Sequence, residues 1–357
     1  MLKTKTFCWM ILADNSHSLK KISLAMWCAL MLTMLLGCSA SEEAKIEAVT
    51  GLSMGTSYTV KWVNQDGLNR DDIASGVAAE LARVEASMST YMDASDLTGF
   101  NGAKANQWYE VPSEMASLVA LSLEISQQTN GAFDVTVGPL VDLWGFGPDP
   151  IPEHIPSQTS LDALRSVIGY EFLQVQQHPP AMLKRTDSAI DLSAIAKGYG
   201  VDVVALWLEA HGFSDYLVEV GGELRAHGLK PDGSPWRIAI ETPTVDARQI
   251  YQVVKVSNMA VATSGNYRNY YEQDGVRYAH TLDPSTLRPV THNLASVTVI
   301  DASAARADAL ATALMVMGGE EGVAWATMHQ VPAYFIMKQS NGFVAQSTAG
   351  FKDYLEK

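Results

Sequence analysis

The stretch DLSAIAKGYGVD, residues 191–202, joins a predicted strand to a predicted helix. The strand is the apolar segment SAIDLS, and the helix runs through AIAKGYGVDVVALWLEAHG and closes at Gly212. On both sides of this junction, strands and helices follow one another without a regular βαβ alternation. We therefore predict an α+β architecture rather than a doubly wound sheet.

Alternating and helical periodicities extend over the rest of residues 46–357. Helices are expected at DDIASGVAAELARVEASMS, SEMASLVALSLEISQQTNG, SLDALRSVIG, AARADALATALMVMG and EEGVAWATMHQ. Strands are expected at YTVKWV, FLQVQ, AMLKR, the two halves of YLVEVGGELRAHG, WRIAIET, YQVVKVSN, MAVATSG, VRYAHTLDPS, ASVTVIDAS, AYFIMKQ and GFVAQS, and a loop-rich stretch at 138–156. No repeat and no linker interrupts this region, so we expect a single domain over 46–357.

Composition excludes some classes of function. Hydrophobic residues make up 47% of the 357 residues and charged residues 18%, which is enough apolar material for a large core. The formal net charge of -14 argues against nucleic-acid binding, because phosphate contacts need clustered Lys and Arg. All cysteines, Cys8, Cys28 and Cys38, precede the globular part, so we expect neither a disulfide nor a thiolate metal site within it.

The N-terminal segment has the pattern of a secretory signal. Lys20 and Lys21 precede an apolar run that ends at Leu36, and the following LLGC is similar to the lipobox of bacterial lipoproteins. We predict a signal peptide over 1–37, a lipidated Cys38, a tether over 38–45 and a periplasmic protein that is lipid-anchored to a bacterial membrane. An uncleaved membrane anchor is the alternative, although the run is short for a spanning helix.

The 191–202 junction is a candidate phosphate site. We place Lys197 in the first turn of the helix, whose free amides attract anions, and Gly198 and Gly200 would allow a ligand to approach the backbone. In an acidic protein, a diphosphate would also need a metal ion. A plain strand-to-helix turn with Ser193 as N-cap is the alternative.

A candidate metal site lies near the C-terminus. Asp308 and Thr312 stand four residues apart on a predicted helix, which puts their β-carbons about 5–6 Å apart on one face. Both side chains offer the hard oxygen ligands that Mg²⁺ prefers. Alternatively, Asp308 only caps or solvates the first helical turn.

Two further segments could contribute to one binding cleft with the candidate phosphate and metal sites. GAFDVTVGPLVDLWGFG, residues 131–147, sets aromatic side chains beside acidic ones, which suits a ring-stacking ligand or a small core of its own. In HTLDPSTLRPV, His280 precedes a proline-bearing turn, and it is a candidate proton acceptor if it faces that cleft.

Together these segments resemble the ApbE family, the FAD:protein FMN transferases. The matching segments, in the family's order, are MGTSY (54–58), MSTY (88–91), GAFDVTVGPLVDLWGFG, DLSAIAKGYGVD, VEVGGELRAHG (218–228), ATSGNY (262–267), HTLDPSTLRPV (280–290) and DALATAL (308–314). The resemblance implies a single ApbE-like (T-fold-like) α+β domain with a mixed, mainly antiparallel sheet and packed helices. It also implies Mg²⁺-dependent transfer of FMN from FAD to a Thr or Ser hydroxyl of a target protein, with release of AMP.

The same resemblance assigns roles to residues. FAD contacts are implied for Met54, Tyr91, Ala132, Phe133, Asp134, Asp191, Lys197 and Leu282. Metal binding is implied for Ala194, Asp308, Ala311 and Thr312, and proton transfer for His280. Family members modify subunits of membrane redox complexes, so a target of that kind is the expected partner. An FAD pyrophosphatase and a non-catalytic flavin-binding lipoprotein remain alternatives.

One position departs from the family pattern. The turn that follows His280 usually contains a Gly where this chain has Leu287. A Leu resists a positive φ by roughly 1–2 kcal/mol, so a differently shaped turn is expected here.

Overall fold

The computed structural model describes residues 44–64, 69–148, 151–152, 154–244, 249–267 and 269–356. The signal peptide over 1–37, the lipidation of Cys38 and most of the tether over 38–45 lie outside these residues and stay predictions. From Lys45 onwards, the described residues form one compact unit.

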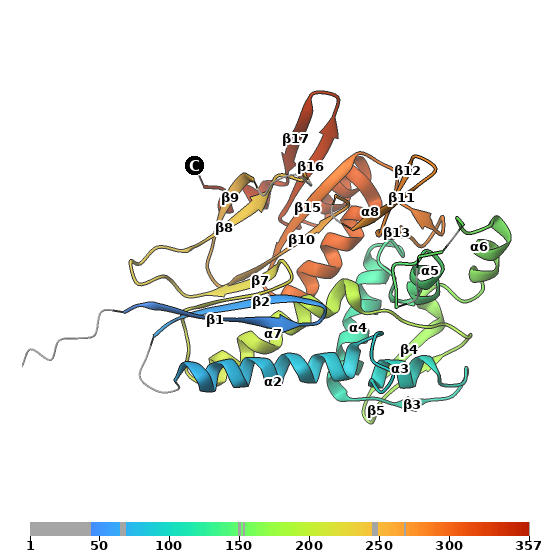
Figure 1. Cartoon of the computed structure of the whole chain (residues 1–357), viewed down its shortest axis with the longest axis horizontal. Helices are drawn as coiled ribbons and strands as arrows, with labels where there is room; N and C mark the ends of the chain where they lie inside the picture. Colours follow the sequence, from blue (N-terminus) through green and yellow to red (C-terminus); the bar gives the residue numbers. More distant parts are fainter. Residues whose placement is uncertain are drawn as a thin grey trace, which may run out of the picture. The chain divides into compact units, whose positions relative to one another are not determined.

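An antiparallel sheet of eight strands forms the centre of this unit (Figure 1). Its order is β1-β2-β6-β7-β10-β15-β16-β17, and every neighbouring pair is antiparallel. The strands are β1 (Ile46–Ser53), β2 (Thr56–Val63), β6 (Tyr216–Val220), β7 (Glu223–His227), β10 (Met259–Gly265), β15 (Leu294–Asp301), β16 (Ala333–Gln339) and β17 (Gly342–Ser347). The predicted α+β domain with a mainly antiparallel sheet is confirmed.

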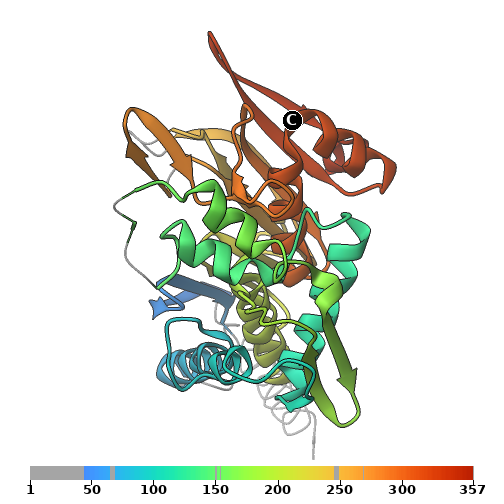
Figure 2. The same ribbon diagram turned by 90° about the vertical axis from the view of Figure 1, so that its right-hand side faces the viewer.

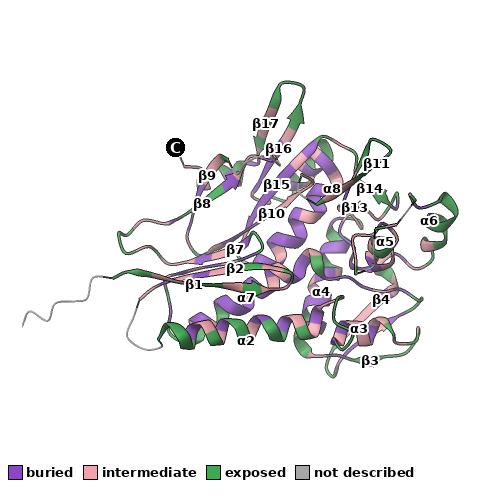
Figure 3. Ribbon diagram, viewed as in Figure 1, coloured by how far each residue is buried: buried purple, intermediate pink, exposed green. Residues whose placement is uncertain are grey.

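Two long helices cover one face of this sheet. Helix α7 (Ser193–Ala210) contacts β6 and β7, and α8 (Ala304–Met328) contacts β10 and β15. Both are buried along most of their length, whereas α2 (Arg70–Met88), which packs on the outside of α7, exposes one side (Figure 3). The opposite face packs against β8 (Trp236–Glu241) and β9 (Ile250–Val256) through a second apolar cluster that includes Val261 and Ile336.

Smaller elements surround the helical face. They are α3 (Asp96–Asn101), α4 (Ser113–Gln128), α5 (Gly138–Leu143), α6 (Gln158–Leu164), the sheet of β3 (Tyr109–Glu110), β4 (Leu173–Gln177) and β5 (Pro180–Lys184), the pairs β11 (Tyr270–Gln273) with β12 (Val276–Ala279) and β13 (Leu282–Asp283) with β14 (Arg288–Pro289), and three 3-10 helices, Val135–Val137, Tyr170–Phe172 and Ala349–Tyr354. Figure 2 shows the green helices α5 and α6 with the orange β11–β12 hairpin above them. The ring of Trp144, at the end of α5, lies 5.5 Å from that of Tyr278 on the hairpin.

Several sequence predictions were wrong in detail. SAIDLS is not a strand, because residues 188–192 have no strand partner among the described residues. The Asp191 N–H donates to the carbonyl of Val135, and the Ile190 N–H donates to the side chain of Asn101. WRIAIET and YQVVKVSN are strands as predicted, but they pair with each other in a separate two-stranded sheet. The stretch 138–156, predicted as loop, contains α5, and β1 at 46–53 was not predicted.

The two helices predicted near the C-terminus are both present within α8, and they meet at Gly318, whose φ of 82° and ψ of -176° are not helical. Among the described residues, no helix is long and apolar enough to cross a membrane.

Candidate active site

The 191–202 stretch positions the site by packing α7 directly onto α8. A β-carbon at Gly198 would lie 2.2 Å from the carbonyl oxygen of Ala304, and one at Gly200 would lie 3.0 Å from Sδ of Met54. The prediction that these glycines admit a ligand was therefore wrong. Other parts of the protein pack against both glycines instead, and Gly198 allows the backbones of α7 and α8 to come into contact.

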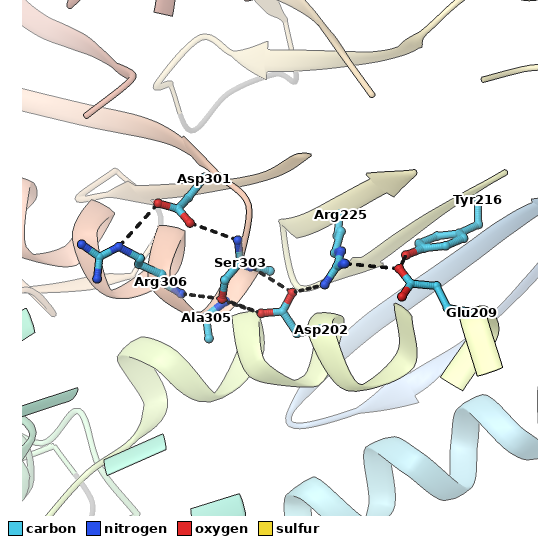
Figure 4. A network of polar contacts seen from close by, with 9 residues as sticks. Asp202, Glu209, Tyr216, Arg225, Asp301, Ser303, Ala305 and Arg306 are labelled. Carbon is cyan, nitrogen blue, oxygen red and sulfur yellow. Dashed lines mark hydrogen bonds and ion pairs between the residues drawn. The ribbon is translucent and has the colours of Figure 1, made fainter. Parts of the chain in front are cut away.

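The last residue of the stretch holds the start of α8. Asp202 accepts hydrogen bonds from the backbone N–H of Ala304 and of Ala305, both at 3.0 Å, and from the hydroxyl of Ser303 at 2.8 Å. It also forms an ion pair with Arg225 of β7 at 3.1 Å. Figure 4 shows how this network ties α7, α8 and the sheet together. Because two N-terminal amides of α8 find their acceptor on α7, the register between the helices is fixed.

That register brings Lys197 and Asp308 together. Lys197 Nζ lies 3.4 Å from Asp308 Oδ2, and the same oxygen accepts the Gly198 N–H at 3.1 Å. Lys197 is the fifth residue of α7, so its predicted place in the first turn was wrong. Asp308 is buried within α8, whose N-cap is Ser303, so the alternative that Asp308 only caps or solvates the helix start was also wrong.

Glu223 is the site residue that sequence reasoning missed. It begins β7, it is buried, and its Oε1 lies 3.4 Å from Lys197 Nζ. Its Oε2 is buried and has no hydrogen-bond partner among the described residues. The sequence feature that could have indicated Glu223 is an acidic residue at an inward-facing strand position, directly after the two glycines of VEVGGELRAHG.

The electrostatics follow from this grouping. Burial would lower the pKa of Lys197, but the charges of Asp308 and Glu223 outweigh it and raise that pKa. Burial raises the pKa of Glu223 to about 8; the Lys197 charge opposes this rise, and the Asp308 charge adds to it. Burial likewise raises the pKa of Asp308, against the charge of Lys197. One ammonium thus serves two buried carboxylates.

The start of α7 differs from the predicted cap. Ser193 is the first helical residue rather than the N-cap. Asp191 instead accepts the backbone N–H of Ser193 at 2.7 Å and also the Ser193 hydroxyl. The Asp191 carboxylate is therefore oriented by the helix start.

A cavity of about 460 Å³ opens beside these residues. Of the residues predicted for the site, it is lined by Tyr91, Ala132, Phe133, Asp134, Asp191, Ala194, Lys197, His280, Leu282, Asp308 and Thr312. Ala311 is buried inside α8 and does not line it. The structure thus brings segments from five distant parts of the sequence to one cavity, and their binding roles stay predictions.

A second cavity, of about 570 Å³, shares four lining residues with the first, namely Tyr91, Asp191, Ser193 and Lys197. Met54, the remaining predicted FAD contact, lines this second cavity. The two hollows therefore meet at the start of α7.

The Asp134 carboxylate is hydrogen-bonded to neighbouring protein groups. Its oxygens accept the N–H and hydroxyl of Thr136 at 2.8 and 2.7 Å and the N–H of Tyr170 at 2.8 Å. Burial raises its pKa, against these hydrogen bonds. The Asp134 carboxylate therefore joins the segment around Thr136 to Tyr170.

His280 has a defined orientation on the cavity wall. Its Nδ1 donates to the carbonyl of Asn269 at 3.1 Å, which leaves Nε2 as the acceptor nitrogen of the neutral ring. Burial lowers the pKa of His280; the bond to Asn269 opposes this, and the charge of Lys197 adds to it. The residue is therefore neutral near pH 7, as a proton acceptor must be.

The turn after His280 keeps the backbone that a glycine would adopt. Leu287 has a φ of 59°, so the expectation of a differently shaped turn was wrong. Its side chain is 1% exposed and packs among Leu140, Trp144 and Leu161. Burying a Leu contributes about 1.5–3 kcal/mol, which offsets the strain of roughly 1–2 kcal/mol. Trp144 Nε1–H also donates to the Leu287 carbonyl at 3.1 Å.

The donors present fit a magnesium ion. The carboxylate of Asp308 and the hydroxyl of Thr312 face one cavity, which Ala194 also lines. No group of three or more His, Cys, Asp or Glu side chains that could hold a metal occurs in the described part of the chain. Mg²⁺ commonly uses one or two carboxylates and takes its other ligands from water and substrate phosphates, so this set suffices.

Comparison with known proteins shows the family of this chain. The chain matches the ApbE family over residues 54–335. A Vibrio cholerae protein named FAD:protein FMN transferase is 42% identical over 332 residues, covering 93% of this chain and 99% of that protein. An Escherichia coli K12 protein of the same name is 38% identical over 318 residues, covering 88% and 91%.

Solved structures agree as well. The crystal structure of Pseudomonas stutzeri flavinyl transferase ApbE in its apo form superposes with a TM-score of 0.81 at 43% identity, covering 88% of this chain and 98% of that one. Since the family match and these relatives extend over most of the sequence, the resemblance is confirmed, and the chain belongs to the ApbE family.

Proposed function

We propose that this protein transfers FMN from FAD to a Thr or Ser hydroxyl of an acceptor protein and releases AMP. The observation that carries the proposal is the meeting of two cavities at Lys197, beside Asp308. A dinucleotide has two bulky ends joined by a diphosphate, and this arrangement offers a hollow for each end with a cation between them. The names of the relatives, FAD:protein FMN transferase, support the same reaction.

In the proposed reaction, the acceptor oxygen attacks the phosphorus on the riboflavin side. A new phosphorus–oxygen bond forms, the bond to the bridging oxygen breaks, and AMP leaves with that oxygen. Nε2 of His280 takes the proton of the attacking hydroxyl, and its tautomer is set by the Asn269 carbonyl. Lys197 neutralises charge that develops on the diphosphate.

Asp308, Thr312 and the backbone carbonyl of Ala194 would hold the Mg²⁺ ion, with Ala311 on the same helical turn. When bound, the ion stabilises negative charge on phosphate oxygens by several kcal/mol. The fixed register between α7 and α8 keeps the ammonium of Lys197 beside these ligands.

We further propose that the reaction occurs in the periplasm on a subunit of a membrane redox complex. The support comes from the sequence, in which LLGC ends an apolar run and Cys38 is the candidate lipidated residue. Palmitate labelling of cells that express the native chain or a Cys38→Ala variant tests the anchor. Equal labelling of both chains would rule out lipidation at Cys38.

The activity itself is tested by incubating the purified protein with FAD and Mg²⁺, with and without an acceptor protein. A transferase releases AMP only with acceptor and adds one FMN to a Thr or Ser, as seen by mass spectrometry. Equal AMP release without acceptor would identify an FAD pyrophosphatase. Tight FAD binding without AMP release would identify a flavin-binding lipoprotein.

A further inference from the structure

The group formed by Lys197, Asp308 and Glu223 holds two buried carboxyl groups but one ammonium. The ammonium lies 3.4 Å from an oxygen of each carboxyl group. Glu223 Oε2 is buried without a hydrogen-bond partner among the residues described. A buried charge is tolerated only when it is paired, and one ammonium cannot neutralise both carboxyl groups when both are ionised. The group can therefore receive a further cation.

The geometry makes Lys197 a residue with two alternative partners. Asp308 also receives the Gly198 N–H, and it shares its cavity with Thr312. A divalent ion on Asp308 would repel the ammonium that now pairs with it. Glu223, on the other side of Lys197, is already at contact distance and can hold the ammonium alone.

The backbone holds Glu223 in this place. It pairs with Val220 directly after the β6–β7 turn, where Gly221 and Gly222 have φ values of 61° and 106°. A β-carbon at Gly221 would lie 3.3 Å from Cδ of Lys197, so the turn also closes against the lysine side chain. Both partners of Lys197 therefore belong to rigid elements.

We propose that Glu223 is a positioning residue that takes over Lys197 when Asp308 binds the divalent cation. It thereby frees the Asp308 carboxylate for the ion and keeps the ammonium in the cavity for an anionic substrate. This inference rests on the proposed ion site at Asp308. Glu223 acts through Lys197 and does not ligate the ion itself.

The test is a double-mutant cycle read by Mn²⁺ binding in the absence of FAD, with the free ion followed by electron paramagnetic resonance. Glu223→Gln preserves the shape but leaves Lys197 with Asp308 alone. We expect it to weaken Mn²⁺ binding by roughly 10–100-fold, as loss of an outer partner of a metal ligand does. In a Lys197→Met background, the same substitution should change the affinity by no more than about twofold, because no ammonium remains to be relocated.

Two further variants separate the outcomes. Glu219→Gln removes a carboxylate of the same hairpin that accepts the Gly222 N–H, and it should bind Mn²⁺ like the native protein. Asp308→Asn should lose Mn²⁺ binding. If Asp308→Asn binds Mn²⁺ like the native protein, the ion site at Asp308 is wrong, and so is the metal ion's part in the proposed function. If only Glu223→Gln binds normally, or if it loses the same affinity in both backgrounds, the positioning role is wrong and the ion site stands.

Discussion

Replacing Gly198 by Ala should separate α7 from α8 and uncouple the site. The new β-carbon would lie 2.2 Å from the Ala304 carbonyl oxygen and 2.6 Å from its carbon, both in the backbone of α8. Carbon–oxygen contacts are normally about 3.3–3.6 Å, so the helices must move apart by about 1 Å. This movement also stretches the Gly198 N–H bond to Asp308.

The cost can be worked from these contacts. Overpacking costs about 1–3 kcal/mol, and the hydrogen bond to a charged group contributes about 1.5–3 kcal/mol. The higher helix propensity of Ala returns about 1 kcal/mol, which leaves a loss near 3 kcal/mol. With an unfolding entropy of about 2.1 cal/mol/K per residue over roughly 310 residues, the Tm should fall by about 5 °C.

Calorimetry and an FMN-transfer assay measure the two effects. A shift of 1 Å in an active site lowers kcat/KM by about 100-fold, and we expect that loss at equal FAD and Mg²⁺. Gly200→Ala is the matched control, because its β-carbon meets only the side-chain ends of Met54 and Leu81, at 3.0 and 3.3 Å. It should stay near native in both assays. Native behaviour of Gly198→Ala, or equal losses in both variants, would refute the reasoning.

Three further outcomes follow. Leu287→Gly should destabilise the protein by about 1–3 kcal/mol in urea unfolding, because the lost side-chain packing exceeds the relieved strain. Leu287→Ala should be the less stable of the two variants, because it loses the packing and keeps the positive φ; the reverse order would contradict the strain. The kcat/KM for FMN transfer should fall as the pH drops through the pKa of His280, which burial lowers below 6.5, because the protonated ring cannot accept a proton. A fall in kcat/KM that begins above pH 6.5, or one that is retained in His280→Gln, would exclude His280 as the proton acceptor. Asp202→Ala should cost about 1–3 kcal/mol of unfolding free energy, because it leaves the N–H groups of Ala304 and Ala305 without their acceptor and leaves Arg225 with Glu209 alone. A loss under about 1 kcal/mol would show that the network is not structural.

Local periodicity predicted most of the fold. The strands at FLQVQ, AMLKR, AYFIMKQ and GFVAQS and the helices that pack on the sheet were found in place, since each is marked by apolar residues within its own segment. SAIDLS failed because its apolar residues are buried between helices without any strand partner. The pairing of β8 with β9 could not be predicted, because partner choice depends on contacts between residues that are distant in sequence.

The candidate site was predicted unevenly for a related reason. Asp308, Thr312 and Lys197 stood out because their side chains carry the chemistry of a metal and phosphate site. The role of Gly198 in helix packing could not be predicted, because a helix–helix contact with Ala304 leaves no local pattern in the sequence. Glu223 was missed because its importance comes from burial beside Lys197, which only the assembled sheet and helix create.

The most direct measurement is a crystal structure with FAD and Mn²⁺, in which anomalous scattering locates the ion. We expect a single strong peak within bonding distance of the Asp308 carboxylate and the Thr312 hydroxyl, with the FAD diphosphate between that ion and Lys197. An ion elsewhere, or a diphosphate bound away from the start of α7, would contradict the account.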